Sequence, residues 1–367
     1  MIEVQIADDS AVVRGLYARM LEAESDIKVT ATAANGEQAI KVARSHPPDV
    51  MILDLEMPVM DGFSAIPHLL AAAPGLQILV ASSLSSQGAE ISLRCLRSGA
   101  ADYLAKPSTT RELVSGPGGS VDFRSELILK VRALGGRSAA KRERKAGGPP
   151  VALAGARSVG LAAARPAMPA LRTIGLKRPE ILAIGSSTGG PQALFTALQG
   201  LGKDYPLPVV ITQHMPATFT RILAGHITSQ TGIPCSEGFD GAVLTAGHAF
   251  LAPGNFHMTI EGTPRSAKIK LNSGPLVNFC RPAVDPMFQS VAAVFGSGTL
   301  AAVLTGMGAD GCRGGEAIVS AGGTLIAQDE ETSVVWGMPG AVAKAGICSA
   351  ILPIDKIGAW INARTKG

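Results

Sequence analysis

Short apolar runs alternate with longer amphipathic stretches through the first third of the chain. Each run has the length of a β-strand, and the stretches between the runs repeat their apolar positions at helical spacing. Regular alternation of strand and helix predicts a parallel sheet with right-handed crossover connections. The expected strands lie at residues 4–7, 29–33, 50–53, 78–81 and 102–105, with helices near 12–21 and 37–44.

Polar side chains follow four of these expected strands at the points where the strands end. The carboxyl ends of parallel strands share one sheet edge, where open α/β sheets bind their ligands. Any single aspartate there could simply cap the next helix, but five polar residues on four strand ends favour a site. Carboxylate oxygens suit Mg²⁺, and a carboxylate beside Mg²⁺, a hydroxyl and a lysine is placed to accept a phosphoryl group. The five residues are Asp8, Asp9, Asp54, Ser82 and Lys106.

The same alternation resumes near residue 180. It predicts a second α/β unit with strands at 181–184, 209–212, 249–251, 300–304 and 324–327, and a hairpin of 258–260 and 267–271.

The first turn of this unit reads GSSTGG and contains the pattern G-x-S-x-G at Gly185, Ser187 and Gly189. A sharp strand-to-helix turn of this kind exposes a serine hydroxyl. The turn has neither the lysine of a P-loop nor the pattern G-x-G-x-x-G, so a phosphate cradle is disfavoured. The pentapeptide alone is a weak signal, and it gains weight only if a base can reach the serine.

A serine becomes a nucleophile when a base takes its proton and an acid orients that base. His214 follows the expected strand at 209–212, and Asp310 follows the strand at 300–304. All three residues therefore lie just past strand carboxyl ends, where neighbouring strands can bring them together. The chain order Ser, His, Asp differs from the order of the α/β-hydrolases and disfavours a general esterase of that type. Three other histidines are poorer candidates, because His226 falls inside an expected helix and His248 and His257 flank glycine-rich loops.

Length and charge divide the chain. With 367 residues it is long for a single core, and its 46% hydrophobic but only 4% aromatic residues suit α/β layers. Residues 136–178 hold ten Lys/Arg and one Glu, a net +9, so that the rest stands at −5 against the total of +4. Because prolines interrupt this segment, we expect a solvated linker rather than a nucleic-acid-binding element. The expected division is a first domain at 1–135, a flexible basic linker at 136–176 and a second domain at 177–367.

One uncharged stretch, from Asp285 to Asp310, has the length of a membrane span. The glycines at Gly296 and Gly298 divide it, which favours an apolar helix, a turn and a buried strand over membrane insertion. The start of the chain lacks the basic region of a signal peptide. Five cysteines without metal-ligand spacing are typical of a reducing compartment, so we expect a cytoplasmic protein.

The motifs IADDS, ILDLEMPVMDG, VASSLS and DYLAKP resemble those of two-component response-regulator receiver domains, which have a flavodoxin-like fold. The resemblance covers most of residues 1–107 and implies a final receiver helix near 120–134. It implies these roles: Asp54 as phosphoacceptor, Asp9, Asp54 and the carbonyl of Glu56 as Mg²⁺ ligands assisted by Asp8, Ser82 as switch hydroxyl, Tyr103 as coupled aromatic, and Lys106 as phosphate partner.

The motifs AIGSSTGGPQAL, ITQHMP, FLAPGNFHM, RPAVDPMFQS, LTGMGADG and WGMPGAV resemble chemotaxis protein-glutamate methylesterases, the CheB family, in which a doubly wound, mostly parallel, Rossmann-like domain follows a receiver. This chain departs from the pattern of the family at two places: Cys280 stands where a histidine is more usual, and Asn255 stands where a glycine is common. We do not expect Cys280 to be a nucleophile, because no basic partner is assigned to it. The implied site is nucleophile Ser187, base His214, orienting Asp310, and an oxyanion hole from the backbone N–H of Met307 helped by Thr188, whose hydroxyl is also expected near His214.

The resemblance implies hydrolysis of glutamate γ-methyl esters on chemoreceptors, with release of methanol, and deamidation of receptor glutamines by the same residues. A chemotaxis sensor histidine kinase would supply the phosphoryl group, Mg²⁺ would serve the receiver, and the esterase would need no cofactor. Two other classes remain open. A non-catalytic adaptor is disfavoured because all three catalytic residues are present, and a DNA-binding output is disfavoured because no helix-turn-helix pattern follows the receiver.

Overall fold

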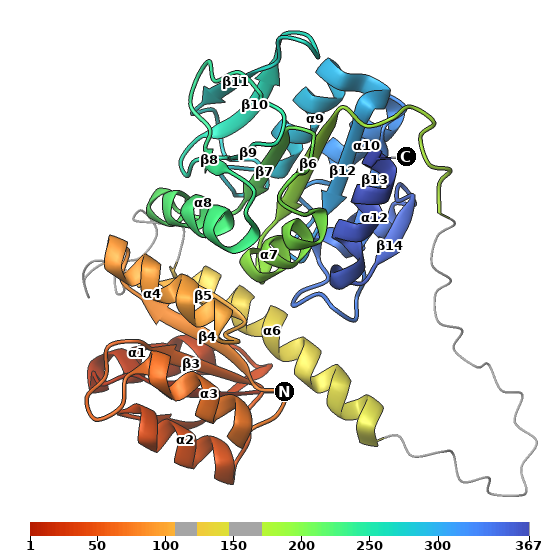
Figure 1. Ribbon diagram of the computed structural model, residues 1–367. Helices are drawn as coiled ribbons and strands as arrows, with labels where there is room; N and C mark the ends of the chain where they lie inside the picture. Colours follow the sequence, from red (N-terminus) through yellow and green to blue (C-terminus); the bar gives the residue numbers. More distant parts are fainter. Residues whose placement is uncertain (107–122, 147–170, 367) are drawn as a thin grey trace, which may run out of the picture.

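The computed structural model describes residues 1–106, 123–146 and 171–366, which form two α/β units (Figure 1). The first unit contains a five-stranded sheet in the order β2-β1-β3-β4-β5, and every pairing in it is parallel. This is the flavodoxin-like strand order that the receiver resemblance implied. The strands are β1 (Ile2–Ala7), β2 (Ile27–Ala33), β3 (Val50–Asp54), β4 (Gln77–Ser82) and β5 (Asp102–Ala105).

Helices cover both faces of this sheet, and polar N-caps fix where four of them begin. The side chains of Ser10, Asn35, Asp61 and Ser85 each accept a hydrogen bond from a backbone N–H of the first turn, which satisfies a donor that the helix itself leaves unpaired. The helices are α1 (Ala11–Glu22), α2 (Gly36–Ser45), α3 (Gly62–Ala72), α4 (Ser86–Arg97) and α6 (Phe123–Ala146).

Helix α6 is longer than the sequence predicted. It continues through Gly135 and Gly136, where the prediction ended it, and reaches Ala146 inside the expected linker (Figure 1). The residues beyond the glycine pair are mostly Ala, Arg and Lys, which have high helix propensity, and this offsets the unfavourable glycines. The start predicted for this helix, near residue 120, lies outside the described residues.

The second unit is built on a seven-stranded sheet in the order β14-β13-β12-β6-β7-β9-β8, again with every pairing parallel. Both edge strands, β8 and β14, are three residues long and were not predicted. The strands are β6 (Ile181–Ser186), β7 (Val209–Gln213), β8 (Cys235–Glu237), β9 (Ala249–Leu251), β12 (Thr299–Val303), β13 (Thr324–Gln328) and β14 (Ala350–Leu352).

The helices of this unit pack in two layers. Buried side chains of α7, α8 and α12 share one core cluster with one face of the sheet, and those of α9, α10 and α11 share another with the opposite face. The helices are α7 (Gly190–Leu201), α8 (Ala217–Thr231), α9 (Val284–Phe295), α10 (Cys312–Ser320), α11 (Met338–Lys344) and α12 (Ile354–Lys366).

The uncharged stretch from Asp285 to Asp310 folds as predicted. It forms α9, the short 3-10 helix η1 (Gly296–Gly298) and the fully buried strand β12. No helix within the described residues is both long enough and apolar enough to cross a bilayer. The predicted hairpin is also present as antiparallel β10 (His257–Glu261) and β11 (Lys268–Asn272), lying beside α9 (Figure 1).

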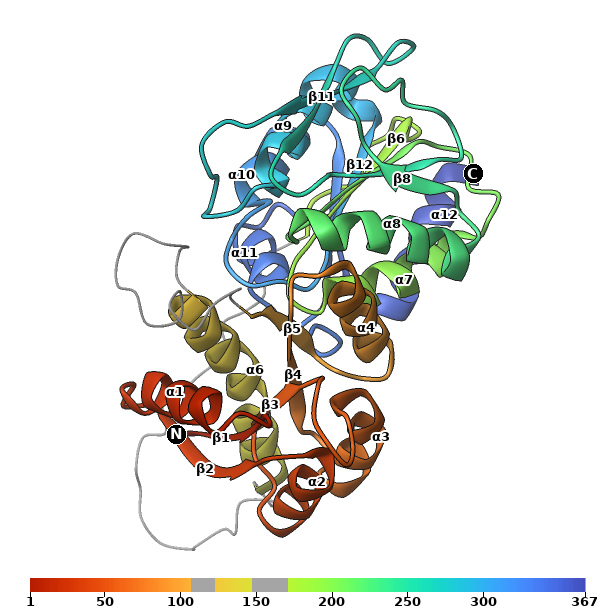
Figure 2. The ribbon, with the colours of Figure 1, turned by 90° about the vertical axis from the view of Figure 1, so that its left-hand side faces the viewer.

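The two units contact each other through α4 of the first and α7 and α8 of the second (Figures 1 and 2). The ring of Tyr103, on β5, stacks on Phe219 of α8 with centroids 4.3 Å apart. Gln192 of α7 donates from Nε2 to the carbonyl oxygens of Leu96 (2.6 Å) and Ala100 (2.7 Å). The acidic edge of the first sheet and the second sheet are therefore connected through packed side chains.

Candidate active site

The second sheet has its topological switch point between β6 and β12. From β6 the chain first builds outward through β7, and it later returns to the other side of β6 with β12. Crevices form at the carboxyl edge of such a point. Ser187 directly follows β6, His214 directly follows β7, and Asp310 lies on the loop after β12. The fold therefore gathers the three predicted residues at one edge.

The turn that carries Ser187 requires glycine. Gly189 has φ +72°, in the left-handed region, and a Cβ there would overlap Val334. A Cβ on Gly190 would overlap Gln213 Oε1. The Ser187 backbone N–H donates to Thr305 O (3.0 Å), and Gly190 N–H donates to Ser187 O (2.7 Å). Close packing on all sides fixes the serine at the start of α7.

Ser187, His214 and Asp310 form a continuous hydrogen-bonded chain. Ser187 Oγ lies 3.2 Å from His214 Nδ1, and His214 Nε2 lies 2.7 Å from Asp310 Oδ2. A carboxylate only accepts hydrogen bonds, so Nε2 carries the ring proton. When the ring is neutral, Nδ1 is then the acceptor that faces the serine hydroxyl, which is the arrangement of a nucleophile beside its base.

The Asp310 carboxylate is held by donors on both oxygens. Oδ2 also accepts from Val284 N–H (2.6 Å), while Oδ1 accepts from Asn278 Nδ2 (2.9 Å) and from the N–H groups of Asp285 and Gly311 (both 3.0 Å). Burial alone would raise the pKa of this carboxyl, but His214 and these backbone donors lower it below its ordinary value. Asp310 is therefore an ionised and immobile partner for the imidazole.

A second buried carboxylate, Asp285, stands beside Asp310. Its Oδ1 accepts from Gly311 N–H (2.9 Å) and Gly314 N–H (2.7 Å), and its Oδ2 accepts from Asn278 Nδ2 (3.0 Å). Burial and the nearby Asp310 charge raise the pKa of Asp285. The Asn278 amide thus lies between two acids. Sequence reasoning missed this role of Asn278, although the quoted motif RPAVD contains Asp285.

The His214 ring has a third neighbour. Cys280 Sγ lies 3.4 Å from Nδ1, the same nitrogen that faces Ser187. The expectation that Cys280 has no basic partner is therefore wrong, because a separation of 66 residues hid the contact. Burial opposes protonation of His214, but the bonds to Asp310 and Cys280 outweigh burial and raise the pKa of His214 to about 10.

Met307 and Thr188 both lie near the serine turn. Within the described residues, no hydrogen bond satisfies the backbone N–H of half-buried Met307, which leaves it free to donate. Thr188 is buried, and its carbonyl accepts from Thr305 Oγ1 (2.9 Å). We expected the Thr188 hydroxyl to contact His214. Among the described residues, the His214 side chain instead bonds to Ser187, Asp310 and Cys280.

The three histidines weighed as poorer candidates have partners elsewhere. His226 Nε2 lies 3.0 Å from Glu90 Oε1, and His248 Nε2 lies 2.8 Å from Ser236 Oγ. Buried His257 bonds to Pro275 O (2.9 Å) and accepts from Ala283 N–H (3.2 Å). These contacts account for all three without reference to Ser187.

The edge of the first sheet gathers the predicted acids around a lysine. Lys106 Nζ lies 2.9 Å from Asp8 Oδ2 and 2.7 Å from Asp54 Oδ1. Carboxylate oxygens of Asp8, Asp9 and Asp54 lie within 4.8 Å of one another, a donor set that fits Mg²⁺. Burial and the Asp8 charge raise the pKa of Asp54, although Lys106 and the backbone of exposed Glu56, which hydrogen-bonds the carboxylate, oppose this shift.

The Ser82 hydroxyl contacts α4 of the first unit, and the Tyr103 ring contacts the second unit. Ser92 Oγ donates to Gly88 O (2.7 Å), so the Ser82 hydroxyl donates to Ser92 Oγ across 2.6 Å. Tyr103 is buried against Phe219, and Lys130 Nζ lies 4.8 Å from its ring centroid. Both residues therefore connect the acidic edge with α4 and α8.

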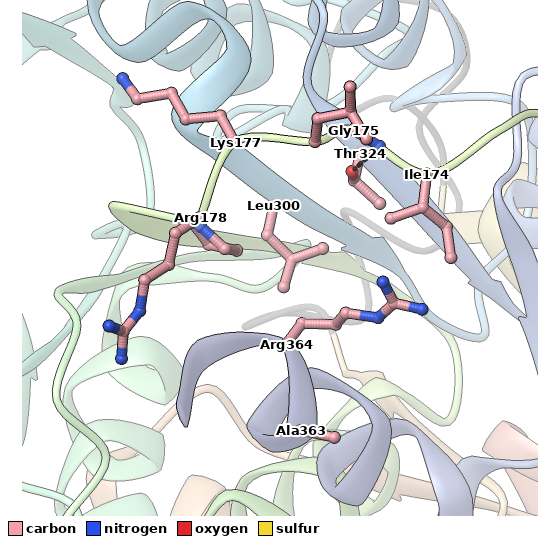
Figure 3. Close-up of a pocket in the computed structure, with 10 residues that line it drawn as sticks. Ile174, Gly175, Lys177, Arg178, Leu300, Thr324, Ala363 and Arg364 are labelled. Atoms are coloured by element: carbon pink, nitrogen blue, oxygen red, sulfur yellow. Dashed lines mark hydrogen bonds between the residues drawn. The ribbon is translucent and has the colours of Figure 1, made fainter. Parts of the chain in front are cut away.

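A cavity of about 260 Å³ lies at the other end of the second sheet and is not part of either site (Figure 3). Leu300 and Thr324, near the beginnings of β12 and β13, line it together with residues 174–179 and Arg364. Gly175 N–H donates to Thr324 Oγ1 (3.0 Å), and the Arg178 guanidinium donates to Thr365 O. The cavity marks where the chain before β6 packs onto the second unit.

The fold and the two sheet edges define a two-unit α/β protein in which a receiver-type acidic edge is joined to a unit with serine-hydrolase geometry. A family model described as CheB methylesterase matches residues 182–361, and one described as response regulator receiver domain matches residues 4–116.

Whole-chain relatives agree with these family matches. A protein-glutamate methylesterase/protein-glutamine glutaminase of Paramagnetospirillum magneticum is 51% identical, and the match covers 98% of this chain and 95% of the relative. A protein of the same name from Rhodospirillum rubrum is 50% identical, and the match covers 98% of this chain and 94% of the relative. The solved catalytic domain of Thermotoga maritima CheB methylesterase, 38% identical, covers 50% of this chain and 98% of its own with a TM-score of 0.49. The chain belongs to the CheB methylesterase family, and it carries the receiver domain that in response regulators is phosphorylated with Mg²⁺.

Proposed function

We propose that this protein hydrolyses glutamate γ-methyl esters on chemoreceptors, releasing methanol, and deamidates receptor glutamines at the same site. The relatives carry both activities in their names. The observation that supports the proposal is the hydrogen-bonded chain from Ser187 Oγ through His214 to Asp310. An ester and a primary amide present the same carbonyl to a nucleophile, so one set of residues serves both reactions.

In the proposed acylation step, Ser187 Oγ attacks the side-chain carbonyl while His214 Nδ1 takes its proton. Asp310 holds the Nε2 proton and stabilises the imidazolium that forms. The N–H of Met307 donates to the developing oxyanion, because none of the described residues accepts a hydrogen bond from it, and Thr188 supports the turn beside it. The imidazolium then protonates the leaving group, which departs as methanol from the ester or as ammonia from the amide.

In the proposed second step, water replaces the departed methanol. His214 Nδ1 takes a proton from the water as it attacks the acyl-serine carbonyl, and the proton returns to Ser187 Oγ as the glutamate is released.

Phosphorylation of the receiver controls this chemistry in our proposal. Asp54 accepts the phosphoryl group from a chemotaxis sensor histidine kinase. Asp8, Asp9, Asp54 and the Glu56 carbonyl would hold Mg²⁺, which supplies charge compensation for phosphoryl transfer. Lys106 already bridges two of these carboxylates and would pair with the incoming phosphoryl oxygens.

The contacts between the two units give this control a physical route. Ser82 would leave Ser92 on α4 to donate to a phosphoryl oxygen, and Tyr103 would move with it. Both changes disturb the surface where α4 and Tyr103 pack on α8. Val334 packs against the receiver core and also against Gly189, two residues from Ser187, so the docked receiver lies at the rim of the hydrolytic site. We infer that docking restricts access and that phosphorylation releases it.

The proposed domain division is a receiver at 1–135, a linker at 136–176 and a catalytic domain at 177–367, with helix α6 extending the receiver side to Ala146. We place the protein in the cytoplasm, where its proposed kinase and the cytoplasmic parts of receptors are found, and assign it no nucleic-acid partner.

Methanol release from a methyl-labelled receptor, measured with and without a small phosphodonor and Mg²⁺, tests the proposal. Ser187→Ala should reduce the rate by at least roughly 10³-fold. The matched control is Ser186→Ala, because the Ser186 hydroxyl donates to Gln213 Oε1 (2.7 Å) and does not donate to His214. A near-normal rate in Ser187→Ala would remove this serine from the mechanism, and an absence of methanol release from the unsubstituted protein would contradict the function itself.

A further inference from the structure

A tight turn brings Cys280 to the catalytic base. Val277 and Cys280 exchange backbone hydrogen bonds of 3.1 and 2.9 Å, and the two residues between them, Asn278 and Phe279, have φ values of 51° and 62°. Asn278 bonds to Asp310, while Phe279 is 89% exposed. The backbone of the turn therefore fixes the half-buried Cys280 side chain beside His214.

One base thus faces two nucleophiles. His214 Nδ1 lies 3.2 Å from Ser187 Oγ and 3.4 Å from Cys280 Sγ, and Asp310 orients the ring for both. A cysteine in contact with an oriented imidazole has the arrangement of an activated thiol. The proposed ester hydrolysis uses only the serine, so the cysteine has no part in it.

We propose that Cys280 is a thiol–disulfide exchange site that takes small disulfides, and that the mixed disulfide formed there stops ester hydrolysis. In this step His214 Nδ1 takes the thiol proton, and Cys280 Sγ attacks one sulphur of the small disulfide. A new S–S bond forms as the old one breaks. The departing thiolate receives the proton from His214 and leaves as a free thiol, so atoms and electrons balance.

The other four cysteines lack this environment. In the described part of the chain, none of their sulphurs contacts an imidazole, and Cys95 and Cys348 are buried. Burial raises the pKa of the thiols of Cys95, Cys235 and Cys348 to about 12, and burial with nearby acids raises the pKa of Cys312. Their thiolate fractions are correspondingly small.

A group attached to Cys280 would block the serine in two ways. It occupies space directly beside Nδ1, where the substrate carbonyl must approach Ser187 Oγ. It would also displace the side chains that surround the half-buried His214 ring and fix its position. Reduction of the mixed disulfide removes the group and should restore hydrolysis, which separates this modification from damage to the fold.

The test uses full-length protein and 2,2′-dithiodipyridine, whose reaction with a thiol releases coloured pyridine-2-thione. We expect one fast thiol in the native protein that is lost in Cys280→Ala and retained in the matched variant Cys235→Ala. His214→Gln, which removes the base, should slow the fast thiol by at least roughly tenfold. Ser187→Ala should keep it, so this arm does not depend on esterase activity.

In the second arm, the unsubstituted protein carrying the pyridyl disulfide should lose at least roughly 90% of its methanol release, and dithiothreitol should restore it. This arm alone rests on the proposed function. A fast thiol that persists in Cys280→Ala, an unchanged rate in His214→Gln, or normal hydrolysis by the loaded protein would overturn the proposal. A folded His214→Gln is recognised by slow reaction of its buried cysteines, since an unfolded chain exposes all five thiols at once.

Discussion

Tyr103 of the receiver lies flat against Phe219 of the catalytic unit, with ring centroids 4.3 Å apart and an interplanar angle of 15°. Tyr103 lies on β5, beside the strand β4 that ends at Ser82, and Phe219 belongs to α8, which begins three residues after His214. A single aromatic contact thus spans the distance between the phosphorylation edge and the loop that carries the base. Stacked aromatic pairs contribute about 0.5–1.5 kcal/mol beyond their buried area, enough to bias a two-state docking equilibrium.

Gln192→Ala should raise hydrolysis in the absence of phosphodonor. The variant removes two hydrogen bonds from α7 to the carbonyls of Leu96 and Ala100. At about 0.5–1.5 kcal/mol each, their loss shifts the ratio of open to docked protein by about fivefold or more. The control is Gln199→Ala, on the same helix, whose side chain bonds to Gln230 O within the catalytic unit. Equal basal rates for both variants would show that docking does not limit access.

Asp54→Asn should abolish the stimulation by a phosphodonor while leaving unstimulated hydrolysis measurable. An amide cannot accept the phosphoryl group, and Asp54 lies at the edge of the other sheet, away from Ser187. Rates with and without phosphodonor and Mg²⁺ measure the effect. Chelation of Mg²⁺ should remove the stimulation from the unsubstituted protein as well. Stimulation that survives in Asp54→Asn would place the phosphoacceptor elsewhere.

The rate of ester hydrolysis should rise with pH on the alkaline side of the ordinary imidazole range. His214 must be neutral to accept the serine proton, and its contacts with Asp310 and Cys280 raise its pKa above the ordinary value. Protonation therefore inactivates the base over a wider range of pH, and activity appears only as the proton is lost. Cys280→Ala should move the midpoint of the kcat/KM profile to lower pH. A midpoint below about 6.5 in the unsubstituted protein would contradict this electrostatic description.

Asn278→Ala should lower kcat by about tenfold with little change in KM. The Asn278 amide donates to both Asp310 and Asp285, and without it two buried carboxylates face each other with fewer donors. Asp310 then holds the imidazole less firmly, which affects the transition state more than substrate binding. Asn272→Ala, at the exposed end of β11, is the matched control. A change confined to KM would instead indicate that Asn278 contacts the receptor.

Residue patterns were sufficient to predict both sheets and the residues at their edges. Buried parallel strands are continuous apolar runs, and the end of each run marks the carboxyl edge of the sheet. Asp54, His214 and the loop that carries Asp310 could therefore be placed at these edges without a structure. The edge strands β8 and β14 were missed: each is three residues long and not fully buried, whereas the equally short β9 is fully buried and was predicted. The predicted end of α6 was wrong because the residues after Gly135 and Gly136 have high helix propensity and continue the helix past the two glycines.

Contacts between distant segments were beyond the same reasoning. Neither the Cys280–His214 contact nor the Tyr103–Phe219 stack follows from local sequence, because each depends on how finished elements pack. The position of the Asn278 amide also depends on a turn with two residues at positive φ. Neither residue is a glycine, so the sequence does not predict this turn.

The lysine that bridges Asp8 and Asp54 also sets an electrical balance at the receiver edge. Counted formally, the three carboxylates and the Lys106 ammonium group carry two negative charges, which one divalent cation would balance. A phosphoryl group on Asp54 replaces the single charge of that carboxylate with about two. This adds about one negative charge to an edge whose fixed cations include Lys106 and Arg14, the latter donating to the carbonyls of Asp8 and Asp9. A neutral hydrogen-bond donor can stabilise the added charge as well, and the Ser82 hydroxyl, whose present partner is only the hydroxyl of Ser92, is able to change partner in response.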